Sequence, residues 1–179
     1  MLTSENTFLL VVDVQGKLAH AMNDKETLFK SIINVINGAR VLGIKILVTE
    51  QNPRGLGTTI PEIYEHLSQI EPISKFSFSC CDNEQFMLEL NSAKPENIVI
   101  AGIESHICVY QTARDLVNLK YNVQILSDAV SSRTAENKQI GLQRTKAVGA
   151  DITSVETVLF EIVKDSQKKE FKEILNIVK

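Results

Sequence analysis

Three reactive side chains, Asp13, Lys75 and Cys108, stand at or just after the carboxyl ends of strand-like segments. Together, a thiol, a carboxylate and an ammonium group can carry out covalent acyl hydrolysis. The thiol attacks a carbonyl carbon, the carboxylate takes and returns a proton, and the cation stabilises the thiolate. Cys108 also lies near the start of an expected helix, where the helix dipole favours an anion. We therefore expect the pKa of this thiol to be lowered.

Each of these residues has a simpler interpretation when it is taken alone. An aspartate after a strand, such as Asp13, often caps a turn or a helix. Lys75 is typical of a solvated surface lysine, and Cys108 is typical of a small residue in a helical core. Only the placement of all three residues at strand ends favours a catalytic role for them.

The segments that must position these residues alternate between apolar runs and amphipathic stretches. The runs that indicate strands are 8–12, 44–49, 71–75, 97–102, 122–127 and 151–153. The helical stretches are 27–42, 83–91, 106–120, 136–148, 154–163 and 168–178. This alternation predicts one Rossmann-like, three-layer α/β/α domain over residues 1–179, with a mostly parallel sheet of about five or six strands.

The carboxyl ends of parallel strands meet at one edge of a sheet, and binding sites lie there. We therefore expect Asp13, Lys75 and Cys108 to converge. The irregular segment 50–74 is long for a connection in a compact domain, and such segments are usually functional.

Composition excludes several classes of protein. The 179 residues carry 19 basic and 22 acidic side chains, a net charge of −3, which is unfavourable for binding a nucleic-acid backbone. The apolar runs are far shorter than the roughly 20 residues of a membrane span, and no basic segment precedes one at the N-terminus. The chain has three cysteines, two of which are adjacent, and this pattern does not indicate a framework of disulfide bonds. We expect a cytoplasmic protein that acts on a small molecule and binds neither nucleic acid nor membrane.

Four segments, in order along the chain, resemble the isochorismatase-like cysteine hydrolases, which include nicotinamidases. These segments are Leu10–Gln15, Lys75–Ser79, Val99–Val109 and Asp128–Arg133. Residues 48–57, 78–81 and 158–161 are further similar to one branch, the isochorismatase domain-containing proteins.

The resemblance implies the catalytic roles. It makes Asp13, Lys75 and Cys108 a catalytic triad, predicts a non-proline cis peptide bond between Ile103 and Glu104, and gives the backbone amides of Glu104 and Cys108 to an oxyanion hole. It also implies a homo-oligomer. The implied reaction is hydrolysis of a small amide or related C–N compound through a thioacyl intermediate.

The chain departs from the nicotinamidase pattern after its second strand. Nicotinamidases carry Asp-x-His and a further His there for a metal, whereas this chain has 50–53 (Glu-Gln-Asn-Pro) and no histidine until His66. We therefore expect no catalytic metal and no cofactor. True isochorismatases often lack the cysteine, so Cys108 favours C–N or acyl hydrolysis over vinyl-ether cleavage.

Six residues near the expected crevice form a candidate substrate pocket with mostly apolar walls, which suits a small organic substrate. They are Gln15, Gln51, Leu56, Phe76, Phe78 and Ile103. His106 is interpreted as a capping or inter-subunit residue, with tuning of the thiolate as the alternative. Cys80 and Cys81 are interpreted as buried structural thiols rather than a redox or metal pair.

Two other functions compete with a hydrolase. The same fold, with the triad retained but no turnover, would serve as a binding or scaffold module. A flavodoxin-like nucleotide binder is the third hypothesis, but the fragment Gly55–Gly57 opens no clear helix and is no phosphate loop.

Overall fold

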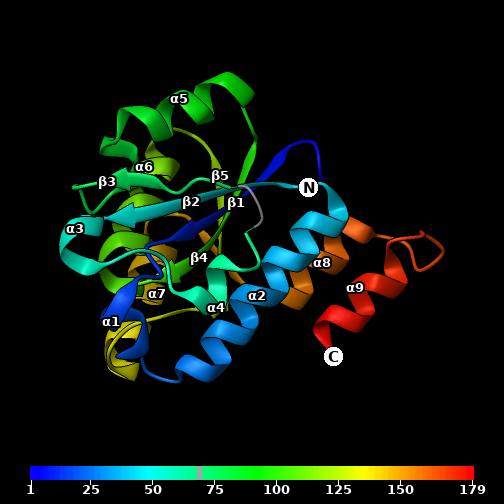
Figure 1. The fold of residues 1–179 in the computed structure, drawn as a ribbon. Helices are drawn as coiled ribbons and strands as arrows, with labels where there is room; N and C mark the ends of the chain where they lie inside the picture. The colour runs from blue at the N-terminus through cyan, green and yellow to red at the C-terminus, as the bar shows by residue number, and fades with distance from the viewer. Residues whose placement is uncertain (68–69) are drawn as a thin grey trace.

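The fold is built on a twisted sheet, seen in the computed structural model, which describes residues 1–67 and 70–179 (Figure 1). Within these residues six strands pair in parallel in the order β3-β2-β1-β4-β5-β6. The strands are β1 (Thr7–Val12), β2 (Lys45–Gln51), β3 (Ile73–Lys75), β4 (Asn97–Ile103), β5 (Asn122–Ser131) and β6 (Asp151–Thr153). The predicted three-layer architecture with a parallel sheet is confirmed.

Helices cover both faces of the sheet, which explains why β1 and β4 are continuous apolar runs. One face packs against α2 (Lys25–Leu42) and α8 (Val155–Val163), and α9 (Phe171–Val178) packs on these two helices. The other packs against α5 (Glu84–Ala93), α6 (Tyr110–Asn118) and α7 (Ala135–Ala147). Successive β1 side chains alternate between the two cores: Leu9 and Val11 join the first, and Phe8 and Leu10 join the second.

The short elements lie near the carboxyl edge of the sheet. They are α1 (Gly16–His20), α3 (Pro53–Leu56), α4 (Pro61–Tyr64), the 3-10 turn η1 (Cys80–Asp82) and the π-helical turn η2 (Ser105–Val109). The sequence did not predict α1, and the irregular segment 50–74 contains the end of β2, α3, α4 and most of β3. Residues 68 and 69 of that segment lie outside the described residues. None of the helices in the described part of the chain combines the length and hydropathy that a membrane crossing requires.

Strand β5 extends four residues beyond its predicted end, to Ser131. The strand was predicted to end at Ser127 because this residue and Asp128 are polar. Both side chains, however, have hydrogen-bond partners that are distant in the sequence. The Ser127 hydroxyl donates to the carbonyl of Thr153 (2.8 Å), and the Asp128 carboxylate accepts from the N–H of Val155 at the start of α8 (3.1 Å). The extension brings the end of β5 beside the end of β4.

Two glycines allow backbone segments to meet beside the turn η2. Gly102, with φ of +116°, lies against β1 so closely that a Cβ would stand 2.1 Å from the carbonyl oxygen of Val12. In α7, a Cβ on Gly141 would stand 2.5 Å from the carbonyl carbon of Ser105. Helix α7 therefore packs directly on the backbone of η2 and fixes its position.

We predict that Gly141→Ala destabilises the protein by about 1–3 kcal/mol, because the added methyl group meets the backbone of Ser105 and His106 rather than a movable side chain. Helix propensity alone would favour alanine by about 1 kcal/mol. Urea unfolding measures the change. Gly38→Ala in α2 is the matched control, since its Cβ meets the flexible end of Leu159. Equal stability changes in the two variants would contradict the argument.

Candidate active site

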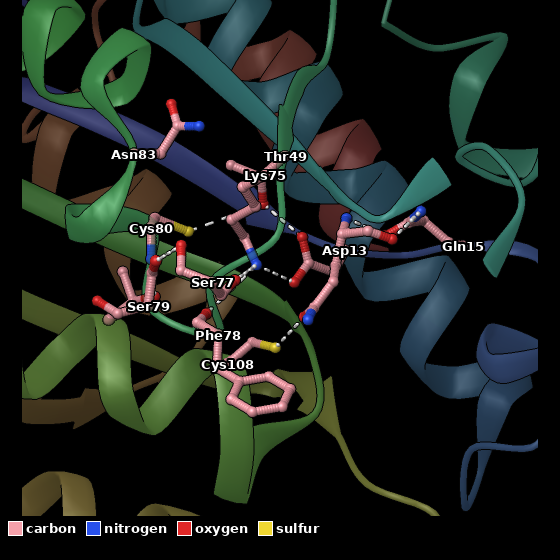
Figure 2. Close-up of polar contacts among 12 residues, drawn as sticks. Asp13, Gln15, Thr49, Lys75, Ser77, Phe78, Ser79, Cys80, Asn83 and Cys108 are labelled. Atoms are coloured by element: carbon pink, nitrogen blue, oxygen red, sulfur yellow. Dashed lines mark hydrogen bonds and ion pairs between the residues drawn. The ribbon is translucent and has the colours of Figure 1, made fainter. Parts of the chain in front are cut away.

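Three strand ends bring Asp13, Lys75 and Cys108 to the same edge of the sheet (Figure 2). Asp13 follows β1, Lys75 ends β3 and Cys108 lies in η2 after β4. The Nζ atom of Lys75 lies 2.6 Å from Oδ2 of Asp13, and the Lys75 side chain is fully buried. The convergence that the sequence predicted is therefore present in the fold.

All three N–H groups of the Lys75 ammonium have acceptors. Besides Asp13, it donates to the carbonyl oxygens of Ser77 (3.1 Å) and Phe78 (3.2 Å) in the loop after β3. Burial by itself would lower the pKa of Lys75, but the Asp13 carboxylate and the thiols nearby outweigh it, and the pKa is raised. Lys75 is therefore a cation whose hydrogen bonds are complete.

The Asp13 carboxylate is held from a second side by Thr49 of β2. The Thr49 hydroxyl donates to Oδ1 at 2.7 Å, and the N–H of Asp13 donates to the carbonyl of Thr49 at 3.1 Å. The backbone of Asp13 has φ of +51°, a left-handed conformation in which aspartate is enriched. Thr49 was not identified as a site residue from the sequence. The only indication in the sequence is that its hydroxyl group follows the apolar residues of the second strand.

The Cys108 thiol is buried, and its Sγ donates to Oε1 of Gln51 at 3.1 Å. Burial raises the pKa of Cys108, the negative charge of Asp13 raises it further, and Lys75 offsets only part of this. The predicted lowering of this pKa is therefore wrong. The physical reason is that the thiol is buried beside the Asp13 carboxylate, and the Lys75 cation, which is paired with Asp13 at 2.6 Å, offsets only part of this.

A cavity of about 110 Å³ opens beside these groups. Its lining is mostly apolar around two carboxylates, one amide and one thiol. The lining residues are Asp13, Leu18, Gln51, Leu56, Phe78, Ile103, Glu104, Ile107 and Cys108. Sequence reasoning missed Leu18, which lies in the unpredicted α1, and Ile107, which lies one residue before the thiol.

Two of the six candidate pocket residues lie elsewhere. Gln15 is completely buried behind β2, where its Oε1 accepts from the N–H of Gln51 (2.6 Å) and its Nε2 donates to the carbonyl of Gly57 (2.6 Å). Phe76 is 78% exposed and lies outside the cavity lining. The remaining four, Gln51, Leu56, Phe78 and Ile103, line the cavity.

The corner between β4 and η2 carries the backbone groups proposed for the oxyanion hole. The peptide bond between Ile103 and Glu104 is cis. The Glu104 carboxylate accepts from the backbone N–H (3.2 Å) and Nε (3.1 Å) of Arg133, and its carbonyl accepts from the N–H of Val109 (3.3 Å). These bonds connect the corner to Arg133, two residues after β5, and to the last residue of η2.

Comparison with known proteins identifies the family. The Isochorismatase domain model matches residues 7–157. The chain belongs to the isochorismatase family. Isochorismatase domain-containing protein 1 of Danio rerio is 38% identical over 156 residues, which are 84% of this chain and 54% of that relative. This chain thus spans about half the length of that relative.

Solved structures of the isochorismatase-like fold agree with the architecture. A structure titled MAR1 ribonuclease, from Caenorhabditis elegans, has a TM-score of 0.93 and 34% identity, covering 99% of this chain and 91% of that one. The YcaC protein of Escherichia coli, titled an octameric hydrolase of unknown specificity, has a TM-score of 0.91. Its 18% identity, over 98% of this chain and 89% of that one, shows a common fold.

The other singled-out residues of this isochorismatase-family chain lie outside the cavity lining. Nδ1 of His106 lies 2.9 Å from the hydroxyl of Ser132. Cys80 is fully buried, and burial raises its pKa to about 11; burial likewise raises the pKa of Cys81 to about 12. Within residues 1–67 and 70–179, no three His, Cys, Asp or Glu side chains are grouped to hold a metal ion.

We predict that Lys75→Met lowers the free energy of unfolding by about 3–5 kcal/mol, because it leaves the buried Asp13 carboxylate without its cation. Adding Asp13→Asn should recover most of the loss, since a neutral pair replaces an unpaired charge. Urea unfolding of the two single variants and the double variant measures the coupling. Lys45→Met is the matched control: the Lys45–Glu89 pair is half exposed and should contribute at most about 1 kcal/mol. Additive losses from the two site substitutions would contradict this account.

Alkylation of Cys108 by iodoacetamide in the substrate-free protein should keep accelerating as the pH rises through 9, the ordinary pKa of a thiol. The reason is that a raised pKa leaves the thiol protonated at neutral pH, so the thiolate fraction grows with pH beyond the usual midpoint. Peptide mass spectrometry separates Cys108 from Cys80 and Cys81. The urea-unfolded chain, the control, should level off near the ordinary thiol pKa. A plateau below pH 8 in the folded protein would refute the raised pKa.

Proposed function

We propose that this isochorismatase-family chain is a cysteine hydrolase that cleaves a small amide or related C–N compound through a thioacyl intermediate on Cys108. The observation that carries the proposal is the common cavity of Cys108 and Asp13, with Asp13 paired to the buried Lys75. A nucleophile, a proton acceptor and a fixed cation are the groups that acyl transfer requires.

The first half-reaction starts from a neutral thiol. Asp13 accepts the proton of Cys108 as Sγ bonds to the carbonyl carbon, and the carbonyl oxygen becomes an oxyanion that the amides of Glu104 and Cys108 stabilise. The C–N bond then breaks, and Asp13 returns the proton to the departing nitrogen. The products are a free amine or ammonia and a thioester on Cys108.

The second half-reaction regenerates the thiol. Asp13 takes a proton from a water molecule, whose oxygen attacks the thioester carbon. The C–S bond breaks, the carboxylic acid leaves, and Cys108 recovers its proton from Asp13. In both halves Lys75 keeps Asp13 in place and moderates its basicity, while its own proton stays on nitrogen.

The cavity supports a small substrate with an apolar part. Its volume is about 110 Å³, and five of its nine lining residues are apolar. The ribonuclease named in the Caenorhabditis elegans title raises RNA as a second substrate class. A net charge of −3 and a small cavity with mostly apolar walls oppose a polyanion, and we propose that the chain binds no RNA.

The remaining proposals concern the whole protein. We propose that residues 1–179 act as one domain without a cofactor, and that the protein forms a homo-oligomer. Large exposed side chains such as Phe76 and Leu88 and the octameric neighbour support an assembly. A cytoplasmic location is proposed because Cys80, Cys81 and Cys108 are all free thiols.

Cys108→Ser and Cys108→Ala should each lower turnover of a small-amide panel by about 10³-fold or more, because no other group replaces the nucleophile. Asp13→Asn should lower it comparably. Ammonia release and mass spectrometry of the quenched enzyme measure turnover and the thioester adduct. Cys81→Ser is the control and should retain activity, since this thiol lies outside the cavity lining.

Full activity in both Cys108 variants would overturn the nucleophile assignment. A panel that yields no turnover and no adduct, together with a partner protein that binds equally to wild type and Cys108→Ala, would instead favour a binding module. A single-stranded RNA in the same panel should stay intact; cleavage that requires Cys108 would make the second substrate class correct.

A further inference from the structure

The Cys108 thiol makes a hydrogen bond to the side chain of Gln51. Its Sγ donates to Oε1 of Gln51 at 3.1 Å, although Asp13 lines the same cavity. The orientation of the Gln51 amide is determined by its other end, where Nε2 lies 3.2 Å from the carbonyl oxygen of Phe76. A carbonyl only accepts hydrogen bonds, so the nitrogen must face Phe76 and the oxygen must face the thiol.

Gln51 is held in this position by a buried side chain. Gln15 accepts from the backbone N–H of Gln51 (2.6 Å) and donates to its backbone carbonyl (3.2 Å). The same Gln15 amide donates to the carbonyl of Gly57 (2.6 Å) and is fully buried. The Gln51 side chain therefore enters the cavity from a fixed backbone, and its oxygen is a permanent acceptor beside Sγ.

Each oxygen of the Asp13 carboxylate already accepts one hydrogen bond. Oδ1 accepts from Thr49 (2.7 Å) and Oδ2 accepts from Lys75 (2.6 Å). An amide oxygen accepts a hydrogen bond but is too weak a base to remove a thiol proton. A hydrogen bond from the neutral S–H also favours the protonated form. The resting arrangement thus holds the nucleophile in its unreactive state.

We propose that Gln51 determines specificity by holding the Cys108 thiol until a substrate N–H group takes its Oε1 and frees the S–H to turn to Asp13. This selects one substrate class within the proposed function, on which the inference rests: small amides that carry at least one N–H. An ester or a fully substituted amide offers no donor to Gln51, so it leaves the thiol hydrogen-bonded where it is.

The holding role is tested on the substrate-free enzyme with methyl methanethiosulfonate, a neutral thiol reagent without N–H groups. Gln51→Met keeps the side-chain length but removes the acceptor, so Cys108 should react about three to ten times faster, the range expected for one lost hydrogen bond. Gln51→Glu adds a negative charge and keeps an acceptor, so Cys108 should react more slowly than in wild type.

The two substitutions also separate holding from a structural role. Both remove the donor to Phe76, so loosening of the loop alone would change the rate in the same direction in both variants. Gln85→Met, at an exposed position on α5, is the matched control and should react like wild type. Peptide mass spectrometry follows Cys108 separately. Wild-type rates in Gln51→Met, or equal shifts in both Gln51 variants, would overturn the proposal.

Substrate selection is tested by comparing kcat/KM for a small primary amide with that for its methyl ester. The amide-to-ester ratio should fall about tenfold in Gln51→Met and stay unchanged in Gln85→Met. An unchanged ratio in Gln51→Met would overturn the specificity role. If wild type hydrolyses no amide while the reagent rates still shift in opposite directions, the holding role stands and only the proposed function fails.

Discussion

The buried ion pair between Asp13 and Lys75 is the interaction on which the site depends. Removing two charges from water costs several kcal/mol for each ion, and the cost is offset only when every hydrogen-bonding group is satisfied. Here the carboxylate is completed by Thr49, and the ammonium is completed by two carbonyls of the loop after β3. The pair and its partners therefore join the ends of β1, β2 and β3 to that loop. The Cys108 thiol is buried beside this pair, and burial together with the Asp13 charge raises its pKa, while Lys75 offsets only part of the rise.

Much of the fold follows from local sequence. In a parallel sheet covered on both faces, strands such as 8–12 and 97–102 must be apolar throughout, and a continuous run is easily recognised. The end of β5 was not predictable in this way. Ser127 and Asp128 are polar strand residues that have partners more than twenty residues away along the chain. A local pattern contains no information about such distant partners.

The candidate site was predictable in its membership but not in its electrostatics. The order of strands brings Asp13, Lys75 and Cys108 together, and that much follows from topology. The pKa direction of Cys108 depends on how deeply the thiol is buried and on how close Asp13 and Lys75 lie to it, and a local sequence pattern gives neither. Gln15 shows the same limit. Gln15 was a candidate pocket residue, whereas its buried side chain holds the backbone of Gln51.

The strand order has a consequence for how the site comes into being during folding. Asp13 and Lys75 are 62 residues apart along the chain, yet β1, β2 and β3 are neighbours that one half of the sheet supplies. Cys108 belongs to the other half, which joins only when β4 docks on β1. Contacts between residues so distant in sequence form slowly, because closing the loop between them costs entropy before the contacts can stabilise the chain. The nucleophile therefore meets its proton acceptor only when both halves of the sheet have paired with β1.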